Sequence, residues 1–442
     1  MPSYLRRRTK IPVPAVHGFG NASDPPAPDN PTGLAFLLLD YVPGKILPLT
    51  ELLESPEDTK VHFYRQLLDI YAELYAQKFD AIGSLMPGPA DDEPILGPLQ
   101  SIQQNDLHIH VNWGRAVSLC IESDADLATP TSFKNTYRRD LARRERERSR
   151  AVSAHDVAVP PARIFASAAD FVHHQYALIF ELFKMPSKVM QPGAAEAEVF
   201  ALHHLRSIVF SSMRPSENLG PFVLSHPDLR WSNIIVEDSH DCTDAPNASN
   251  APDASCIQGH RTFTIRAILD WEFAGTVPPQ LFLPPFWLTG LPAELLGWPS
   301  YEYRYRECQR ILVSLAASSA HCRDLAQAWT EDLATTLEFA AASVLRHHNE
   351  ALELHWKLVY KLCRYSIQPD EAKRDFVKMH GQNSPWGRDI EWRMALSQMY
   401  RKYLVENNLW TEPEQPEVFG SAAALSTTLP RTSESPNLPS AD

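Results

Sequence analysis

The sequence predicts an α+β fold, in which a small N-terminal part made of strands precedes a larger and mainly helical part. Apolar runs of strand length occur near the N-terminus and again at 234–236 and 265–269. Around these runs, apolar residues recur at helical spacing in several long segments. Of the 442 residues, 44% are apolar, which is sufficient for a sizeable core.

The first strands are expected within residues 11–42. The segment 11–16 contains alternating prolines, which suit an extended edge strand because proline has no amide hydrogen to donate. Gly18-Phe-Gly20 is expected to form a turn before a loop at 21–31, and 34–42 has the length of a buried strand. Pro43-Gly44 then provides a break at which the chain can turn into the helical part.

The helical part is predicted to begin at Ser55, with this serine as the capping residue, Pro56 at the first position and two acids near the positive end of the helix dipole. One apolar face is expected to consist of Val61, Tyr64, Leu67, Leu68, Tyr71, Leu74 and Tyr75. Further helices are expected at 165–185, 195–213, 303–320, 325–346, 350–366 and 388–405. The apolar segment 282–292 contains too many prolines to span a membrane and is expected to form a buried loop.

Two polar motifs flank the central apolar runs. His226-Pro-Asp228-Leu-Arg-Trp-Ser-Asn233 comes directly before the run at 234–236, and Asp270-Trp-Glu272 follows the run at 265–269. Phosphoryl transfer requires one carboxylate to accept a proton from the attacking hydroxyl, which Asp228 can do. Magnesium prefers hard oxygen ligands, which Asn233 and Asp270 can supply. The spacing alone is weak evidence, because aspartate and asparagine are also common in ordinary turns.

At these motifs the chain resembles the aminoglycoside phosphotransferase and choline kinase-like family, whose members have a protein kinase-like fold. The resemblance rests on His226, Asp228, Leu229, Asn233, Leu269, Asp270, Trp271 and Glu272. It extends more weakly to about residue 400 and is closest to a fungal-type branch in the segments 4–14, 37–44 and 79–85. Pro227 stands where the family usually has glycine, and Trp231-Ser232 replaces a common Pro-Gly pair.

The resemblance implies an ATP-dependent transfer of the γ-phosphate to a hydroxyl of a small molecule, with Asp228 as base and His226 bracing the catalytic loop. Mg²⁺ would bind Asn233 and Asp270, and the backbone of Asp40, Tyr41 and Val42 would meet the adenine. Glu272 would be a supporting partner or an ordinary polar residue. Residues 1–44 would be the remnant of a small N-terminal lobe and its hinge.

The phosphate-binding lysine of this family and its glutamate partner have no counterpart in the sequence, and no Gly-x-Gly-x-x-Gly occurs. By the resemblance they would precede Met1. Lys10, Lys45 and Lys60 are the nearby lysines, and none lies in a strand of the expected type. A non-catalytic kinase-like binding module is therefore the alternative hypothesis. A metal-dependent hydrolase is disfavoured, because the histidines show no complete zinc spacing.

Charge and cysteine content limit the remaining possibilities. The net charge of −13 argues against broad binding to nucleic acid or to anionic membranes. Basic residues do gather at 138–150, but acids lie between them and favour a solvated helix face. The six cysteines form no Cys-x-x-Cys, no apolar signal segment follows the first residues, and a cytoplasmic protein with free thiols is expected.

The large helical part is expected to span 45–410. Within it, 238–260 is predicted to be an unstructured insertion between the two motifs, because it is polar and contains few large apolar residues. The tail at 411–442 is rich in proline, serine and threonine and is also expected to be unstructured.

Overall fold

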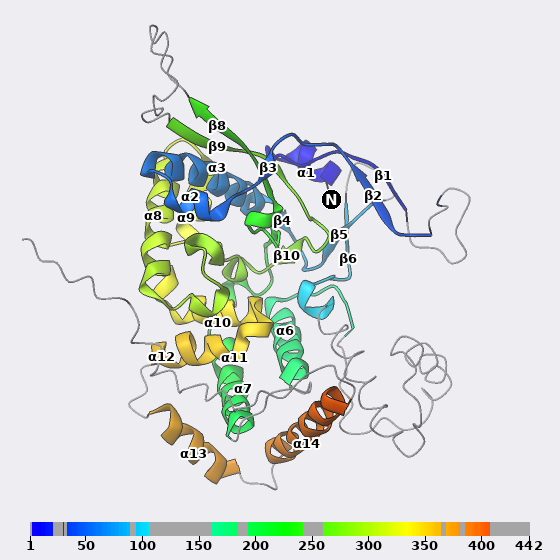
Figure 1. The fold of residues 1–442 in the computed structure, drawn as a ribbon, viewed down its shortest axis with the longest axis vertical. Helices are drawn as coiled ribbons and strands as arrows, with labels where there is room; N and C mark the ends of the chain where they lie inside the picture. Colours follow the sequence, from blue (N-terminus) through cyan, green and yellow to red (C-terminus); the bar gives the residue numbers. More distant parts are fainter. Residues whose placement is uncertain are drawn as a thin grey trace, which may run out of the picture.

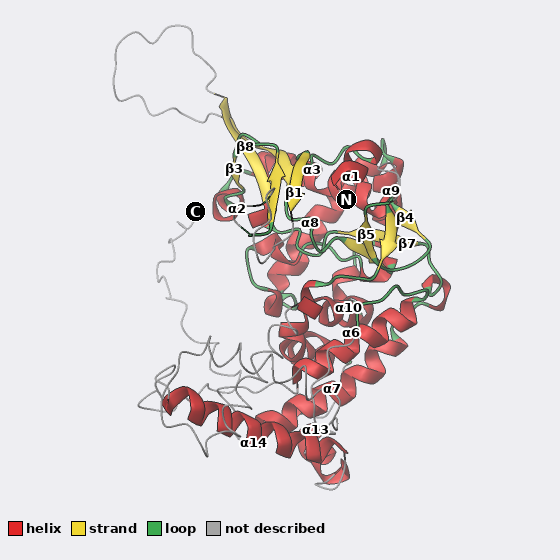
Figure 2. Cartoon of the chain, turned by 90° about the vertical axis from the view of Figure 1, so that its right-hand side faces the viewer, coloured by secondary structure: helices red, strands yellow, loops and turns green. Residues whose placement is uncertain are grey.

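The computed structural model describes residues 2–20, 30, 33–88, 94–105, 161–183, 193–241, 260–363, 368–380 and 385–406. The fold is α+β, as the sequence predicts, and all of the strand pairs are antiparallel. The strands gather toward one end of the molecule, and helices α6, α7 and α10 to α14 form the other end (Figures 1 and 2). None of the described helices has both the length and the apolarity needed to cross a membrane.

The chain begins with helix α1 (Pro2–Arg8), and a two-stranded sheet follows, β1 (Val16–Gly20) with β2 (Phe36–Leu39). The expected turn at Gly18-Phe-Gly20 is wrong, because these residues belong to β1 and pair with β2. The expectation of a buried strand at 34–42 is also wrong. Leu37 and Leu38 are 60% and 58% exposed, since no further strand or helix of the described chain covers this hairpin.

Residues 11–15 are not part of a regular strand. They run extended beside the central hairpin, where Pro12 O accepts a hydrogen bond of 2.8 Å from Ile268 N. Ile11 and Val13 are buried, so this segment connects the N-terminal part to the core.

The central hairpin consists of β8 (Ile234–Asp241) and β9 (His260–Ile268), and the short strand β3 (Lys45–Ile46) pairs with β8. Both strands are longer than the apolar runs at 234–236 and 265–269 indicated. Residues 238–241 and 260 lie at the edges of the predicted insertion and are paired strand residues, so the prediction is wrong for them. Residues 242–259 lie outside the described chain.

A second sheet has the strand order β4-β7-β10-β5-β6. Its strands are β4 (Lys78–Phe79), β5 (Ser84–Met86), β6 (Ile95–Gly97), β7 (Phe222–Ser225) and β10 (Gly275–Val277). β7 is fully buried and leads directly to His226, while β10 begins shortly after Glu272. Each motif is therefore held between a strand of this sheet and a strand of the central hairpin.

Helix α2 (Leu49–Glu54) precedes α3 (Glu57–Ala76), the first long helix. On α3, the predicted apolar residues Tyr64, Leu67, Leu68, Tyr71 and Leu74 are buried. The predicted cap is wrong, because Ser55 ends α2 and its Oγ donates to Glu51 O, while α3 has no side-chain cap.

The remaining helices follow the predicted segments with two breaks and one addition. The segment 325–346 divides at 329–336, and 350–366 contains a π-helical turn at His355–Val359. Among these later helices, α13 is the one that the sequence did not predict. The helices are α6 (Ala168–Phe183), α7 (Ala194–Ser211), α8 (Pro299–Ala316), α9 (Ala320–Ala328), α10 (Leu337–Arg346), α11 (Ala351–Leu354), α12 (Tyr360–Leu362), α13 (Pro369–His380) and α14 (Pro385–Glu406).

The segment after the second motif forms short 3₁₀ turns, and Phe282, Trp287 and Leu288 within it are buried, which confirms the expected buried loop. Cys308, Cys322 and Cys363 form no disulfide within the described chain, and the other cysteines lie outside it. The basic segment 138–150 and the tail 411–442 also lie outside it.

Candidate functional site

The two sequence motifs are neighbours in space. A 3₁₀ turn at Trp231–Asn233 leads directly into β8, and Asp270 follows two residues after β9 ends. Ile234 pairs with Ile268, and Leu269 N donates to Asn233 O at 2.9 Å. The central hairpin therefore places the end of the first motif beside the start of the second.

His226 links the motifs through its side chain. It is 5% exposed, and its Nε2 lies 2.8 Å from Leu269 O. A carbonyl oxygen can only accept, so Nε2 carries the hydrogen. Burial lowers the pKa of His226, although the bond to Leu269 O and the charges of Asp228 and Asp270 act against this shift. The geometry is that of a neutral imidazole that holds the loop. The imidazole also packs against Trp271, and the centroids of the two rings are 4.5 Å apart.

Asp228 is held by two side chains of its own loop. Asn233 Nδ2 donates to Asp228 Oδ2 at 2.9 Å and to Asp228 O at 2.8 Å. Arg230 forms a two-point ion pair, with Nε at 2.8 Å from Oδ1 and Nη2 at 3.3 Å from Oδ2. Since the amide nitrogen of Asn233 faces Asp228, the amide oxygen Oδ1 of Asn233 is the atom that can ligate a cation.

Asp270 has φ of 64°, the one positive value that the described chain shows for a residue other than glycine. Such a backbone costs free energy and is tolerated best by aspartate and asparagine. The charges of Asp270 and Asp228 both add to the burial that raises the pKa of Glu272. Asp228, Asp270 and Glu272 therefore share one acidic region at the end of the hairpin.

Asn233 and Asp270 are chemically suited to magnesium, which commonly takes only one or two protein oxygens and completes its shell with phosphate oxygens and water. The described residues contain no group of three His, Cys, Asp or Glu side chains arranged to hold a metal.

The predicted adenine-binding segment lies at the base of the exposed hairpin. The Asp40 N–H donates to Ala15 O at 2.9 Å, so this amide is already used. The Asp40 carboxylate accepts from Ala15 N, and His17 and Arg6 also contact it. Tyr41 is 88% exposed. This segment therefore offers mainly the backbone of Tyr41 and Val42 to a ligand.

Two pockets lie near the predicted residues. Val42 lines an open pocket of about 420 Å³ between α1, residues 9–14 and Arg266, which none of the motif residues reaches. A much smaller pocket, of about 20 Å³, adjoins the motifs at Pro227 and Phe273. Its other walls come from residues 99–103, β7, β10, α6 and α10.

Three contributors at the site were not identified from the sequence. Arg230 is exposed and pairs with Asp228, and its place two residues after Asp228 was the only sequence signal for this ion pair. Trp287 Nε1 donates to Leu229 O at 2.8 Å and so supports the loop from 58 residues away. Arg346 reaches the small pocket from α10 and had no sequence signal.

Comparison with known proteins identifies no relative: no family model, no curated protein and no solved structure matches this chain.

Proposed function

We propose that this protein is a magnesium-dependent phosphotransferase of kinase-like fold that moves the γ-phosphate of ATP to a hydroxyl of a small molecule. The observation that carries the proposal is the pairing of the two motifs by the central hairpin. Asn233 bonds to Asp228, and the adjacent chain, at Leu269, bonds to both His226 and Asn233. A turn without function does not require two polar motifs from distant segments to be joined in this way.

In the proposed reaction, Asp228 orients the acceptor hydroxyl and takes its proton as the oxygen bonds to the γ-phosphorus. The bond from that phosphorus to the bridging oxygen breaks, and its electron pair leaves with ADP. Asn233 Oδ1 and the Asp270 carboxylate would hold the magnesium, which neutralises charge on the phosphates when bound. A carboxylate oxygen can accept two hydrogen bonds, so the acceptor hydroxyl would share Oδ1 of Asp228 with Arg230 Nε.

A non-catalytic kinase-like binding module is the second candidate, and three observations favour it. Arg230 already occupies both oxygens of Asp228. Among residues with described positions, the lysine ion pairs lie away from the motifs, and Lys45 bonds to Asp238 and Glu51. The exposed apolar hairpin β1–β2 is also what an incomplete small lobe would present.

The test separates the two candidates with Asp228→Asn, using Asp324→Asn as an exposed control on α9. Binding of Mg-ATP is measured by calorimetry, and ADP release is measured with a panel of small hydroxyl compounds. For an enzyme, Asp228→Asn should reduce turnover by about 10²- to 10⁴-fold and leave nucleotide binding nearly unchanged.

Binding without ADP release in the wild type would favour the non-catalytic module. Turnover that persists unchanged in Asp228→Asn would remove this residue from the role of base.

A further inference from the structure

Arg346 is a cation that has no partner of opposite charge among the described residues. It is the last residue of α10, and its Nη2 donates to Ser225 Oγ at 3.3 Å. Burial lowers the pKa of Arg346 to about 10. No carboxylate of the described chain forms an ion pair with it. Arg346 is partly exposed, and a guanidinium taken largely out of water is costly unless an anion accompanies it.

The surroundings of Arg346 offer little compensation. The adjacent His347 and His348 have pKa values lowered to about 3 by burial, with a further contribution from the charge of Arg346. Tyr71 is the one group that favours the charged form of Arg346, and burial raises the pKa of this phenol. The C-terminus of α10 supplies at most about half of a negative charge. Most of the positive charge therefore stays unbalanced.

A second polar side chain at the same pocket also has no partner within the described part of the chain. Gln175 is 3% exposed, and its main-chain oxygen accepts from His348 Nε2 at 3.1 Å. Its side-chain amide makes no hydrogen bond within the described chain, and it lines the small pocket together with Arg346 and Ser225. The pocket volume of about 20 Å³ is room for about one water-sized atom, so a single oxygen of a ligand can enter it.

We propose that this pocket binds a carboxylate of the acceptor molecule, with Arg346 and Gln175 as donors. The inference rests on the proposed function, because Pro227 and Phe273 line the same pocket and are adjacent to the two motifs. A carboxylate provides the missing negative charge, and one of its oxygens can enter the pocket and accept from Arg346. The acceptor would then be a hydroxy acid, whose hydroxyl lies toward Asp228.

Binding is tested with glycolate as the probe, and glycolamide serves as its neutral analogue. Thermal unfolding is followed at fixed ionic strength in the wild type, in Arg346→Met and in Arg323→Met. Arg323 is an exposed arginine that donates to Ala316 O and forms no ion pair within the described chain, so it is a matched control. Glycolate should raise the Tm of the wild type and of Arg323→Met but not of Arg346→Met. Without ligand, Arg346→Met should be at least as stable as the wild type.

The proposal is overturned if Arg346→Met keeps the response to glycolate, or if chloride or glycolamide raises the Tm equally. Gln175→Leu provides a second variant and should weaken the response. In ADP-release assays, the kcat/KM for a hydroxy acid should be roughly 10- to 100-fold higher than that for the corresponding amide. This preference should disappear in Arg346→Met.

The two proposals can fail separately. Glycolate binding without any ADP release would support the carboxylate pocket and contradict the phosphotransferase proposal. Turnover of neutral acceptors that does not depend on Arg346 would support the phosphotransferase proposal and contradict the carboxylate pocket.

Discussion

His226 joins the two motifs with one hydrogen bond, and its replacement tests that link. His226→Ala should destabilise the protein by about 1–3 kcal/mol, because Leu269 O loses its side-chain donor in a buried place. His226→Gln should recover part of this loss, since the Gln amide can donate from a similar position. Urea unfolding measures both variants. Equal stability of the alanine and glutamine variants would show that the hydrogen bond contributes little.

The backbone of Asp270 predicts a difference between two substitutions at that residue. Asparagine tolerates the left-handed conformation, whereas alanine pays about 1–2 kcal/mol for it. Asp270→Asn should therefore be nearly as stable as the wild type, and Asp270→Ala should be less stable. Both should weaken Mg-ATP binding if Asp270 ligates the metal. Urea unfolding and calorimetry with varied magnesium measure the two effects, and unchanged magnesium dependence would contradict the ligand role.

At the scale of elements, Gly44 controls how the chain passes from the N-terminal part to β3. Its φ is 139°, and an added Cβ would lie 2.6 Å from Val236 O on β8. Gly44→Ala should cost more than about 1 kcal/mol. Gly18→Ala on β1 is the control, because its Cβ would meet nothing within 4 Å, and it should be neutral or slightly stabilising. Thermal unfolding compares the two, and equal effects would contradict this explanation.

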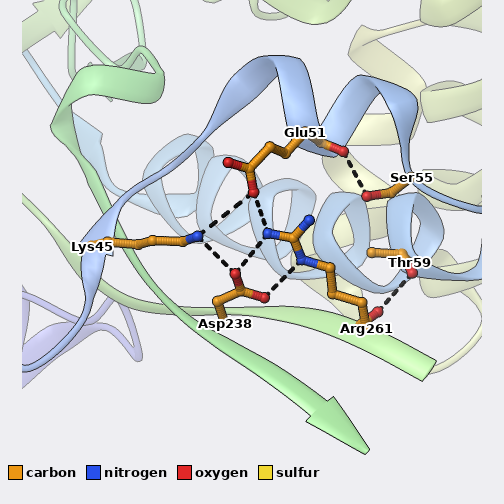
Figure 3. A network of polar contacts seen from close by, with 6 residues as sticks. All are labelled: Lys45, Glu51, Ser55, Thr59, Asp238 and Arg261. Carbon is orange, nitrogen blue, oxygen red and sulfur yellow. Dashed lines mark hydrogen bonds and ion pairs between the residues drawn. The ribbon is translucent and has the colours of Figure 1, made fainter. Parts of the chain in front are cut away.

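The outer end of the central hairpin is fixed by an ion-pair network (Figure 3). Asp238 on β8 accepts from Arg261 on β9 at 2.9 and 2.7 Å and from Lys45 on β3 at 2.7 Å, and Glu51 on α2 contacts both cations. The hydrogen bonds of Arg261 are the main reason that the pKa of Asp238 is far below its ordinary value. The network ties three strands and α2 together.

Asp238→Asn should destabilise the protein by about 1–3 kcal/mol at pH 7. Because the folded-state pKa of Asp238 is lowered, its contribution is complete above the ordinary carboxyl range near pH 4 and is lost as the pH falls through the lowered value. The difference between wild type and variant should therefore shrink in strong acid. Denaturant unfolding at several pH values measures it, and a difference that grows on acidification would be inconsistent with the network.

At the scale of the whole molecule, buried and partly buried histidines predict sensitivity to acid. Burial lowers the pKa of His174 to about 4 and that of His347, His348 and His355 to about 3. In the unfolded chain these groups titrate near pH 6.5, so the unfolded state binds more protons between pH 6.5 and 4. Stability should be greatest above pH 6.5 and fall steadily below it.

Each of these histidines adds a slope of up to about 1.4 kcal/mol per pH unit. Thermal unfolding from pH 7.5 to 4.5 measures the combined loss, and His355→Phe should reduce the slope. A flat profile over this range would show that the histidines are protonated in the folded protein.

The periodicity of α3 and the apolar runs at 234–236 and 265–269 were sufficient to predict these elements, because the spacing of apolar residues indicates which local structure buries them. The ends of β8 and β9 were not predictable in this way. Their outer halves contain Glu237, Asp238 and Arg261, and such polar residues favour a loop in a sequence-based prediction. The structure shows that ion pairs between the strands stabilise these residues in the hairpin. The exposed hairpin β1–β2 was misassigned for the opposite reason, because an apolar run does not reveal whether anything covers it.

The sequence by itself determined the α+β class, the main helices and the order of the two polar motifs, since each depends on residue type and spacing over a few turns. Only the tertiary structure decided that Leu269 bonds to His226 and Asn233, that Arg230 occupies Asp228, and that Arg346 reaches the pocket beside Pro227. These contacts join segments up to 121 residues apart, as in the bond from Arg346 to Ser225. Local propensity carries no information about such pairs, because they form only when the sheets and helices pack together.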